Sequence, residues 1–232
     1  MFGSISTSRL ILLLPVFALF VSACAPQSRW DYTPQQTHIV RTGETLFTIA
    51  FRYGHDHKDL ARWNGLGDGS LIYPGQAIRL TPPSGTTARA SAPSKPAPRR
   101  SIPPPPSDPS PDWTWPTSGR VSAEFTGNPG SGTGIMVDGR AGQSVKAAAA
   151  GHVVYSGGGL IGYGQLIILK HNDTYLSAYG HNASLLVKEG DNIKKGQRIA
   201  TMGEGPGQKP RLHFEIRRNG KPVNPRQFLP AR

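Results

Sequence analysis

Residues 166–179 of this chain read LIILKHNDTYLSAY, and this stretch decides the fold of the C-terminal half. Two short runs rich in apolar, β-branched and aromatic residues flank Asn172-Asp173, a pair typical of a hairpin turn. Comparable runs lie at 121–125 and 151–155, with glycine-rich turns near them and few windows of helical period. These features predict a mainly antiparallel sheet with one buried face.

The composition excludes several classes of protein. The 232 residues include 28 Gly and 22 Pro, which is too many for a helical bundle. The single Cys cannot form an internal disulfide framework or a multi-thiolate metal site. The formal net charge of +12 favours a polyanionic partner, and nucleic acid, anionic lipid and an anionic cell-wall polymer all fit that description.

The N-terminal residues predict export and a lipid anchor. Arg9 precedes an apolar run over 10–21, which is too short to span a bilayer of about 30 Å and fits the core of a signal peptide. The residues VSAC at 21–24 resemble a bacterial lipobox, in which residues 1–23 are removed and Cys24 is acylated. A conventional secretory signal with an incidental cysteine is the alternative. The lack of an Asp after the cysteine resembles lipoproteins of the outer membrane, so we expect a lipid-anchored protein at its periplasmic face, away from nucleic acid.

Between 82 and 114 the chain has the composition of a spacer. It contains Pro, Ser, Ala, Thr and Arg with almost no large apolar residue, and it includes four consecutive prolines at 103–106. Such a stretch cannot bury enough apolar surface to fold, and proline keeps it extended. A polyproline ligand for a partner domain is the alternative. We therefore expect an N-terminal tether at 24–36, a module at 37–81, the linker, and a second domain at 115–232.

The segment 37–81 has the pattern of a strand, two helices and a strand. Apolar residues recur at i, i+3, i+4 and i+7 from Leu46, which places them on one helical face. The expected elements are a strand at 39–40, a helix at 46–53 ending at Gly54, a second helix capped by Asp56, and a closing strand at 76–80.

Three motifs in this segment have a characteristic spacing, VRTGETL at 40–46, WNG at 63–65 and PGQAI at 74–78. They closely resemble the LysM peptidoglycan-binding module. The resemblance implies an α+β fold of order βααβ that binds N-acetylglucosamine-containing glycan in a shallow groove between two loops. The residues to which it assigns glycan contact are Gly43, Glu44, Thr45, Leu46, Ile72 and Tyr73. His55 and His57 have metal-like spacing, but no third ligand is near in sequence, and we expect them on the solvated surface.

Five motifs mark the C-terminal part. They are GHVVY at 151–155, GYG at 162–164, YGH at 179–181, KGQ at 195–197 and LHFEIR at 212–217. Together they closely resemble the lysostaphin-type, or LytM-type, zinc endopeptidase domain, which implies the same mainly antiparallel β fold. Active members of that family hold zinc with the His and Asp of a His-x-Gly-x-Asp motif and the second His of a His-x-His motif. Two further His serve in catalysis.

Most of the zinc-site positions of that family are lost in this chain. By the resemblance, the ligands of the first motif become Gly132 and Met136, and the catalytic His of the second motif becomes Arg211. The ligand His213 and one catalytic His, His181, remain. A catalytic zinc needs three protein ligands, whereas glycine has no donor, a thioether is a poor zinc ligand and a guanidinium repels the cation. We therefore expect no metal or other cofactor and no hydrolysis by this domain.

The order of lipobox, LysM-like module, proline-rich spacer and degenerate LytM-like domain resembles the NlpD-type murein hydrolase activators. The resemblance implies docking onto a periplasmic N-acetylmuramoyl-L-alanine amidase, which relieves its autoinhibition so that septal peptidoglycan is split during cell separation. The groove positions implied are Gly132, Met136, His181, Arg211 and His213. Members of this group often keep an Asp at the position of Met136, which bears on partner choice. We expect Met136 to suit an adaptable binding surface and Arg211 to pair with a partner carboxylate. An active zinc endopeptidase and a passive tether between outer membrane and peptidoglycan are the alternatives.

Overall fold

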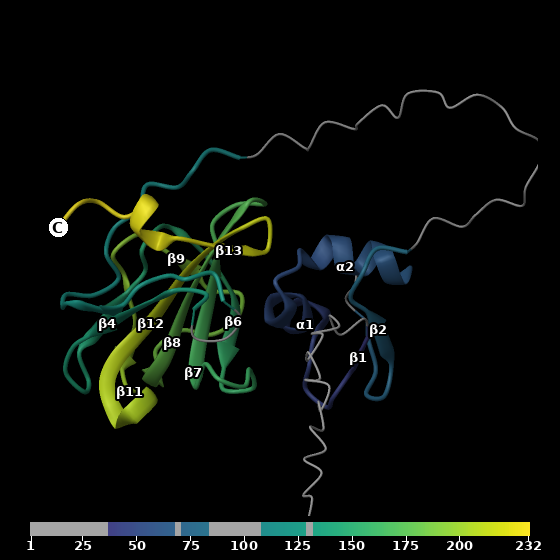
Figure 1. Cartoon of the computed structure of the whole chain (residues 1–232), viewed down its shortest axis with the longest axis horizontal. Coiled ribbons are helices and arrows are strands. Elements are labelled where there is room, and N and C mark those ends of the chain that lie inside the picture. The colour runs from purple at the N-terminus through teal and green to yellow at the C-terminus, as the bar shows by residue number, and fades with distance from the viewer. Residues whose placement is uncertain (1–36, 68–70, 84–107, 129–131) are drawn as a thin grey trace, which may run out of the picture. The chain divides into compact units, whose positions relative to one another are not determined.

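The computed structural model describes residues 37–67, 71–83, 108–128 and 132–232 (Figure 1). The lipobox with Cys24 and the linker residues 84–107 lie outside the described residues. Among the helices in the described ranges, none is long and apolar enough to cross a membrane.

The N-terminal module has the predicted order of a strand, two helices and a strand. β1 (Thr37–Ile39) pairs antiparallel with β2 (Ala77–Arg79). Between them in the chain lie α1 (Leu46–Tyr53) and α2 (His57–Asn64). The predicted order βααβ is therefore confirmed. β1 lies one to two residues before its predicted bounds, and β2 is one residue shorter at each end than predicted.

Local sequence signals begin and end both helices. The Thr45 hydroxyl accepts a hydrogen bond from the backbone of Thr48 at the start of α1, and the Asp56 carboxylate caps the start of α2 in the same way. Gly54 and Gly65 end the two helices with φ of 70° and 65°, a left-handed conformation that a Cβ disfavours. The left-handed backbone conformation therefore favours glycine at both positions.

The apolar faces of the two helices meet the strands in one small core. Its buried residues are Val40, Leu46, Ile49, Ala50, Leu60, Ala61, Ile78 and Leu80. The positions predicted to share a helical face in α1 lie in or against this core. Burial of this stripe accounts for the stability of two helices of only eight residues each.

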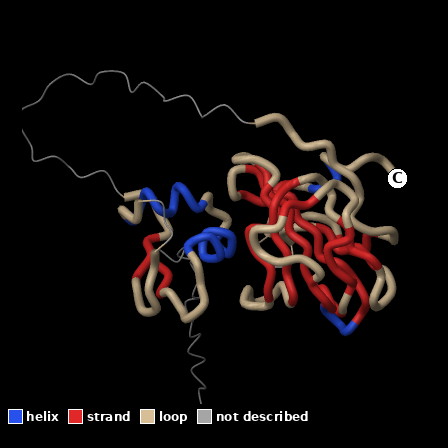
Figure 2. Tube along the Cα trace, turned by 180° about the vertical axis from the view of Figure 1, so that it is seen from behind, coloured by secondary structure: helices blue, strands red, loops and turns tan. Residues whose placement is uncertain are grey.

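The C-terminal domain is built mainly of strands, which are red in Figure 2, and these strands pair antiparallel. Within the described residues, the main path of the sheet runs in the order β3-β4-β12-β8-β7-β6-β9, with β10 pairing β5 and β8, and with β11 and β13 pairing β12. The strands are β3 (Val121–Ala123), β4 (Ile135–Asp138), β5 (Ser144–Lys146), β6 (Gly151–Gly157), β7 (Gln165–Lys170), β8 (Tyr175–Leu185), β9 (Asn192–Ile193), β10 (Arg198–Met202), β11 (Glu204–Gly205), β12 (Lys209–Arg218) and β13 (Lys221–Val223). Two short 3₁₀ helices, Pro206–Gln208 and Pro225–Gln227, complete the domain. This confirms the predicted mainly antiparallel β fold.

The predicted hairpin is formed by β7 and β8. The Asn172 side chain accepts hydrogen bonds from the backbone of Thr174 and Tyr175, which closes the turn. Alternate residues of β7 enter two different clusters of buried residues, with Ile167 on one face of the sheet and Ile168 on the other. The strand therefore carries apolar side chains on both faces, which accounts for its continuous apolar sequence.

The C-terminal domain begins earlier than the sequence predicts. Trp113 is buried, with its ring edge against His171 and Tyr175. The backbone of Thr114 donates to the carbonyl of Ala148. Residues 108–114, which the composition assigns to the linker, thus pack on this domain, because one aromatic anchor stands at the end of the proline-rich segment.

Candidate functional site

A cavity of about 270 Å³ lies in the C-terminal domain at the junction of β4, β8 and β12. Met136 on β4 is the cross-strand partner of His213 on β12, and His213 is also the partner of Gly180 on β8, next to His181. The antiparallel register therefore brings three of the predicted groove residues together. The cavity is lined by Met136, Ile161, Gly162, Tyr163, His181, Pro206 and His213.

Two of the predicted groove residues lie outside this lining. Gly132 lies before β4, where an added Cβ would clash with the Thr126 hydroxyl. Arg211 stands opposite Asp138 in the β4–β12 register, with Nη2 3.4 Å from the Asp138 carboxylate. The carboxylate that we expected Arg211 to find on a partner is therefore supplied within the chain.

The residues at the family's zinc positions do not fit a zinc ion. Gly132 has no donor, and Met136 offers a thioether where the metal needs a carboxylate. Across the described ranges, no group of three His, Cys, Asp or Glu side chains is placed to hold a metal ion. His213 is the one zinc ligand of the family pattern that keeps its donor.

A buried carboxylate stands behind His213. Glu215 is fully buried and accepts hydrogen bonds from the Thr133 hydroxyl, from the Tyr163 hydroxyl at 2.9 Å and from His213 Nε2 at 2.8 Å. Its second oxygen accepts from Arg217 Nε at 2.8 Å. Burial, the largest influence, raises the pKa of Glu215, but the Arg217 guanidinium and the hydrogen bonds from His213 and Thr133 outweigh it and lower the pKa to about 2. Glu215 is therefore an ionised acceptor at neutral pH.

The charge on Glu215 determines which nitrogen of His213 carries a proton. Because an ionised carboxylate can only accept, the Nε2 of His213 must donate. The other nitrogen, Nδ1, is buried and has no hydrogen-bond partner among the described residues. His213 therefore presents an unsatisfied nitrogen from a side chain that lines the cavity.

His181 faces His213 across the cavity. The two rings have centroids 6.0 Å apart. Burial lowers the pKa of His181 to about 4, with further contributions from His213 and Arg211, so its imidazole is neutral at pH 7. His181 has a φ of 61°, and its backbone N and O bond to Tyr163 and Gly203. The orientation of the His181 ring therefore depends on a strained backbone that is held by hydrogen bonds of both its N–H and its carbonyl group.

His171, His55 and His57 pack against or hydrogen-bond to other parts of the chain. His171 Nδ1 donates to the carbonyl of Ala150, and its Nε2 lies 2.8 Å from the Ser177 hydroxyl. His55 packs edge-on against Trp63, with ring centroids 5.2 Å apart. His57 is half-buried with its ring 5.6 Å from that of Phe47, so the pair at 55 and 57 is less solvated than the sequence indicates.

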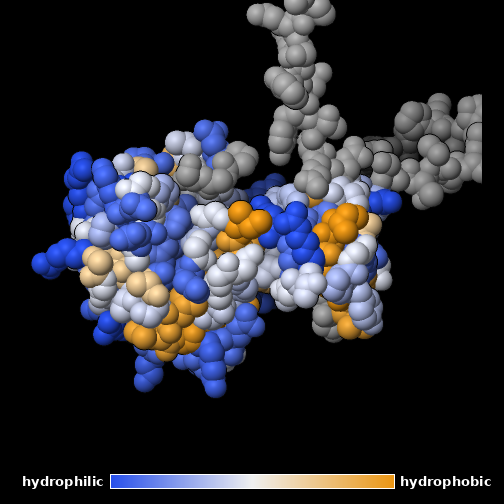
Figure 3. All heavy atoms as spheres, turned by 90° about the horizontal axis from the view of Figure 1, so that it is seen from below, coloured by the Kyte–Doolittle hydropathy of each residue, from blue (hydrophilic) through white to orange (hydrophobic). Residues whose placement is uncertain are grey.

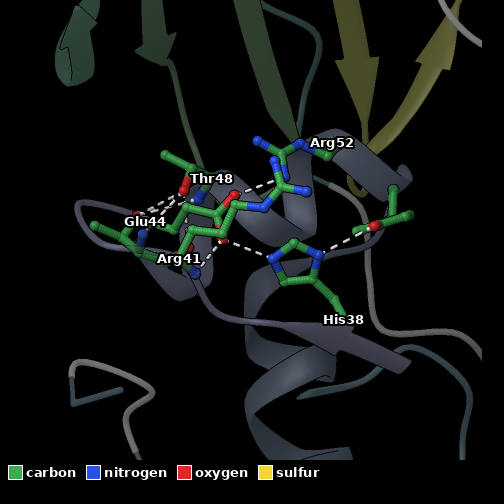
Figure 4. A network of polar contacts seen from close by, with 7 residues as sticks. His38, Arg41, Glu44, Thr48 and Arg52 are labelled. Atoms are coloured by element: carbon green, nitrogen blue, oxygen red, sulfur yellow. Dashed lines mark hydrogen bonds and ion pairs between the residues drawn. The ribbon is translucent and has the colours of Figure 1, made fainter. Parts of the chain in front are cut away.

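In the N-terminal module, Glu44 is the centre of a compact ion network (Figure 4). His38 Nε2 lies 2.6 Å from one carboxylate oxygen, which also accepts from the backbone of Arg41, and Arg52 donates to the other oxygen at 2.6 Å. His38 Nδ1 lies 3.1 Å from the Tyr53 hydroxyl. Burial, the largest influence, raises the pKa of Glu44, but these hydrogen bonds outweigh it and lower the pKa. The Glu44 side chain is therefore engaged within the module.

The remaining predicted glycan contacts differ in accessibility. Leu46 is 3% exposed and belongs to the core, Thr45 is the N-cap of α1, and Gly43 has a φ of 82° in the turn before it. Ile72 packs partly against the core, whereas Tyr73 is 60% exposed. Of these side chains, Tyr73 offers the most surface to a ligand.

Exposed apolar side chains form local patches in an otherwise hydrophilic surface, as the face drawn in Figure 3 shows in orange. Ile39, Leu71 and Tyr73 are more than half exposed in the N-terminal module, and Ile161 and Leu186 are more than half exposed in the C-terminal domain. Ile161 also lines the cavity, which extends its apolar lining to the surface.

Some site residues were not assigned a role from the sequence. Thr133, Tyr163, Glu215 and Arg217 surround one carboxylate, and His38 and Arg52 hold another. A signal for the first cluster was present, since His213, Glu215 and Arg217 alternate along a strand and so share one face. The side chains from other strands gave no local signal.

Comparison with known proteins agrees with both domains. The family model described as "LysM domain" matches residues 38–81, and the one described as "Peptidase family M23" matches residues 130–225. The chain is 44% identical over 248 residues to "Lipoprotein NlpD/LppB homolog" of Pseudomonas aeruginosa, covering 91% of this chain and 82% of the relative. It is 37% identical over 264 residues to "Murein hydrolase activator NlpD" of Salmonella typhimurium, covering 87% and 70% respectively. It is 35% identical over 235 residues to "Uncharacterized lipoprotein YgeR" of Escherichia coli, covering 95% and 92%.

These matches confirm the LysM and LytM-type resemblances and extend across the whole domain arrangement. The identity exceeds 30% over most of each relative's length, so the chain matches these relatives across both domains and not in one domain alone. The chain therefore belongs to the NlpD/LppB family of lipoproteins, with a LysM domain followed by a domain of peptidase family M23.

Proposed function

We propose that this chain activates a periplasmic N-acetylmuramoyl-L-alanine amidase during septal wall splitting and cell separation. The observation that carries the proposal is a peptidase-family cavity in which only His213 remains of the three zinc-ligand positions. A relative named "Murein hydrolase activator NlpD" supports the same role. The emptied cavity is the site of docking.

The chain itself does not hydrolyse peptidoglycan in this proposal. Zinc-dependent hydrolysis needs a metal held by three protein ligands with an open position for water. The substitutions at Gly132 and Met136 remove two of these ligands, and Arg211 stands at a catalytic position with its guanidinium beside Asp138. The domain therefore acts by binding.

The cavity suits an amphipathic helix of the amidase. Met136, Ile161, Tyr163 and Pro206 supply an apolar lining, and the flexible thioether of a Met adapts to different side chains. The neutral His181 adds no charge that docking would have to desolvate. Activation is then a shift of the amidase toward its open state, and its size is limited by the difference in affinity for the two states.

The LysM domain binds peptidoglycan glycan, and Cys24 carries the acyl chains that hold the protein at the periplasmic face of the outer membrane. Tyr73 supplies the exposed aromatic surface for the glycan, and Gly43 supplies backbone at the facing loop. Glu44, Thr45, Leu46 and Ile72 shape these loops from beneath, since their side chains are engaged in the network, the helix cap or the core.

Dye release from labelled peptidoglycan tests the proposal. We expect release when the chain and a purified amidase of the same organism are combined, and little from either alone. Ile161→Ala should weaken activation because it removes exposed apolar surface at the cavity, while the matched control Leu186→Ala should not. Zinc-dependent release by the chain alone would establish an endopeptidase. Failure to enhance any periplasmic amidase of that organism would leave the tether as the function.

A further inference from the structure

Three soft or borderline donors line the same cavity. Met136 contributes a thioether, and His181 and His213 contribute imidazoles. Met136 and His213 are cross-strand partners and are 4% and 2% exposed. Imidazoles whose centroids are 6.0 Å apart can both reach an ion that lies about 3 Å from each ring centre, given metal–nitrogen distances of about 2 Å.

His213 already has the orientation of a metal ligand. Metal-binding histidines almost always donate their second ring N–H to a carboxylate or carbonyl, which aims the free nitrogen at the metal. His213 Nε2 donates to Glu215 at 2.8 Å, and its Nδ1 is buried without a partner among the described residues. Glu215 is itself held by Thr133, Tyr163 and Arg217. The outer shell of a metal site is thus in place around His213, and the nitrogen that would bind the metal, Nδ1, has no other partner among the described residues.

The charge and softness of these donors select the ion. None of the three donors is anionic, so they would not neutralise the charge of a divalent ion. A thioether with imidazoles favours Cu(I), whereas a thioether is a poor zinc ligand and leaves zinc with only two imidazoles at this site. We propose that this cavity binds one Cu(I) ion through His213 Nδ1, the His181 imidazole and the Met136 thioether.

This site goes beyond the docking role, and its test needs no amidase. The chain carrying Cys24→Ser, so that no thiol is present, is titrated anaerobically with Cu(I) against the chromophoric chelator bicinchoninate. We expect one tightly bound Cu(I) per chain. Loss of even an outer-shell group at a metal site weakens binding about ten-fold or more, so Met136→Leu and His181→Gln should each weaken it at least about ten-fold.

Met202→Leu is the matched control, because Met202 is a buried Met that does not line the cavity. It should bind Cu(I) as the parent does. X-ray absorption of the bound copper should show sulfur scattering that Met136→Leu removes and Met202→Leu retains. Thermal unfolding of each variant confirms that it is folded, and the two substitutions at 136 and 181 test the site from different strands.

Three results would overturn the proposal. The chain could fail to compete with bicinchoninate for Cu(I), Met136→Leu could bind with the parent's affinity and the same copper spectrum, or the copper could be lost only when His55 and His57 are replaced by Gln. The last result would place the ion on the N-terminal module, where these two histidines lie.

Discussion

The buried Glu215 cluster should contribute a large part of the stability of the C-terminal domain. Glu215→Gln preserves the shape of the side chain but removes the charge that Arg217 balances, and it turns an amide N–H₂ toward groups that donate. Removing one partner of a buried ion pair costs about 3 to 5 kcal/mol. We therefore expect the free energy of unfolding to fall by about 3 kcal/mol or more at neutral pH.

The lowered pKa of Glu215, which has the same contacts as its cause, corresponds to a contribution of the same order. A carboxyl whose pKa falls from 4.5 to about 2 on folding contributes about 3 kcal/mol at neutral pH. Because the folded pKa is the lower one, this contribution is fully present above the unfolded pKa and is lost as the pH falls toward 2. The parent should thus lose stability between about pH 4.5 and 2, and Glu215→Gln should lack this component.

Urea and thermal unfolding measure both quantities. For a domain of this size, a loss of about 3 kcal/mol lowers Tm by roughly 10 °C or more. Glu204→Gln is the matched control, since Glu204 is exposed on β11 and its replacement should change stability by less than about 0.5 kcal/mol. A loss below about 1 kcal/mol for Glu215→Gln, or an unchanged acid dependence, would refute the view that this carboxylate is ionised and paired.

Cys24→Ser should release the protein from the outer-membrane fraction, because the acyl anchor is lost; unchanged fractionation and gel mobility would contradict the lipobox. Tyr73→Ala should reduce co-sedimentation with peptidoglycan by several-fold while Tm stays within a few degrees, since the side chain is 60% exposed; equal co-sedimentation would remove Tyr73 from the glycan site. Gly65→Ala should cost about 1 kcal/mol in urea unfolding, because φ is 65° and space is not limiting; a neutral result would mean that the end of α2 relaxes freely.

The elements that could be predicted from sequence are those determined by near neighbours. Helix ends at Gly54 and Gly65 and the cap at Asp56 depend on residues within one turn, and the hairpin depends on the Asn172 side chain and its own turn. Short-range hydrogen bonds and backbone preferences decide such features. Their positions in the structure follow the sequence closely.

What the sequence did not reveal depends on strands that are distant in the chain. The Glu215 carboxylate is satisfied by Thr133, 82 residues before it, and by Tyr163, 52 residues before it. The pairing of Arg211 with Asp138 follows from the β4–β12 register, which no local pattern reports. Trp113 similarly looked like part of the linker because its burial depends on residues such as Tyr175.

The residues at the former zinc positions suit a site that holds no divalent cation. Position 136 is 4% exposed, so an Asp there would be a buried carboxylate without a divalent cation to balance it. Met136 removes that charge, and the cationic Arg211 is balanced by Asp138 on the facing strand. The charges near the cavity are thereby compensated within the chain, and the lining stays apolar. While the cavity holds no ion, a partner helix buries its apolar face against this lining without desolvating an unpaired charge, which favours docking over repulsion.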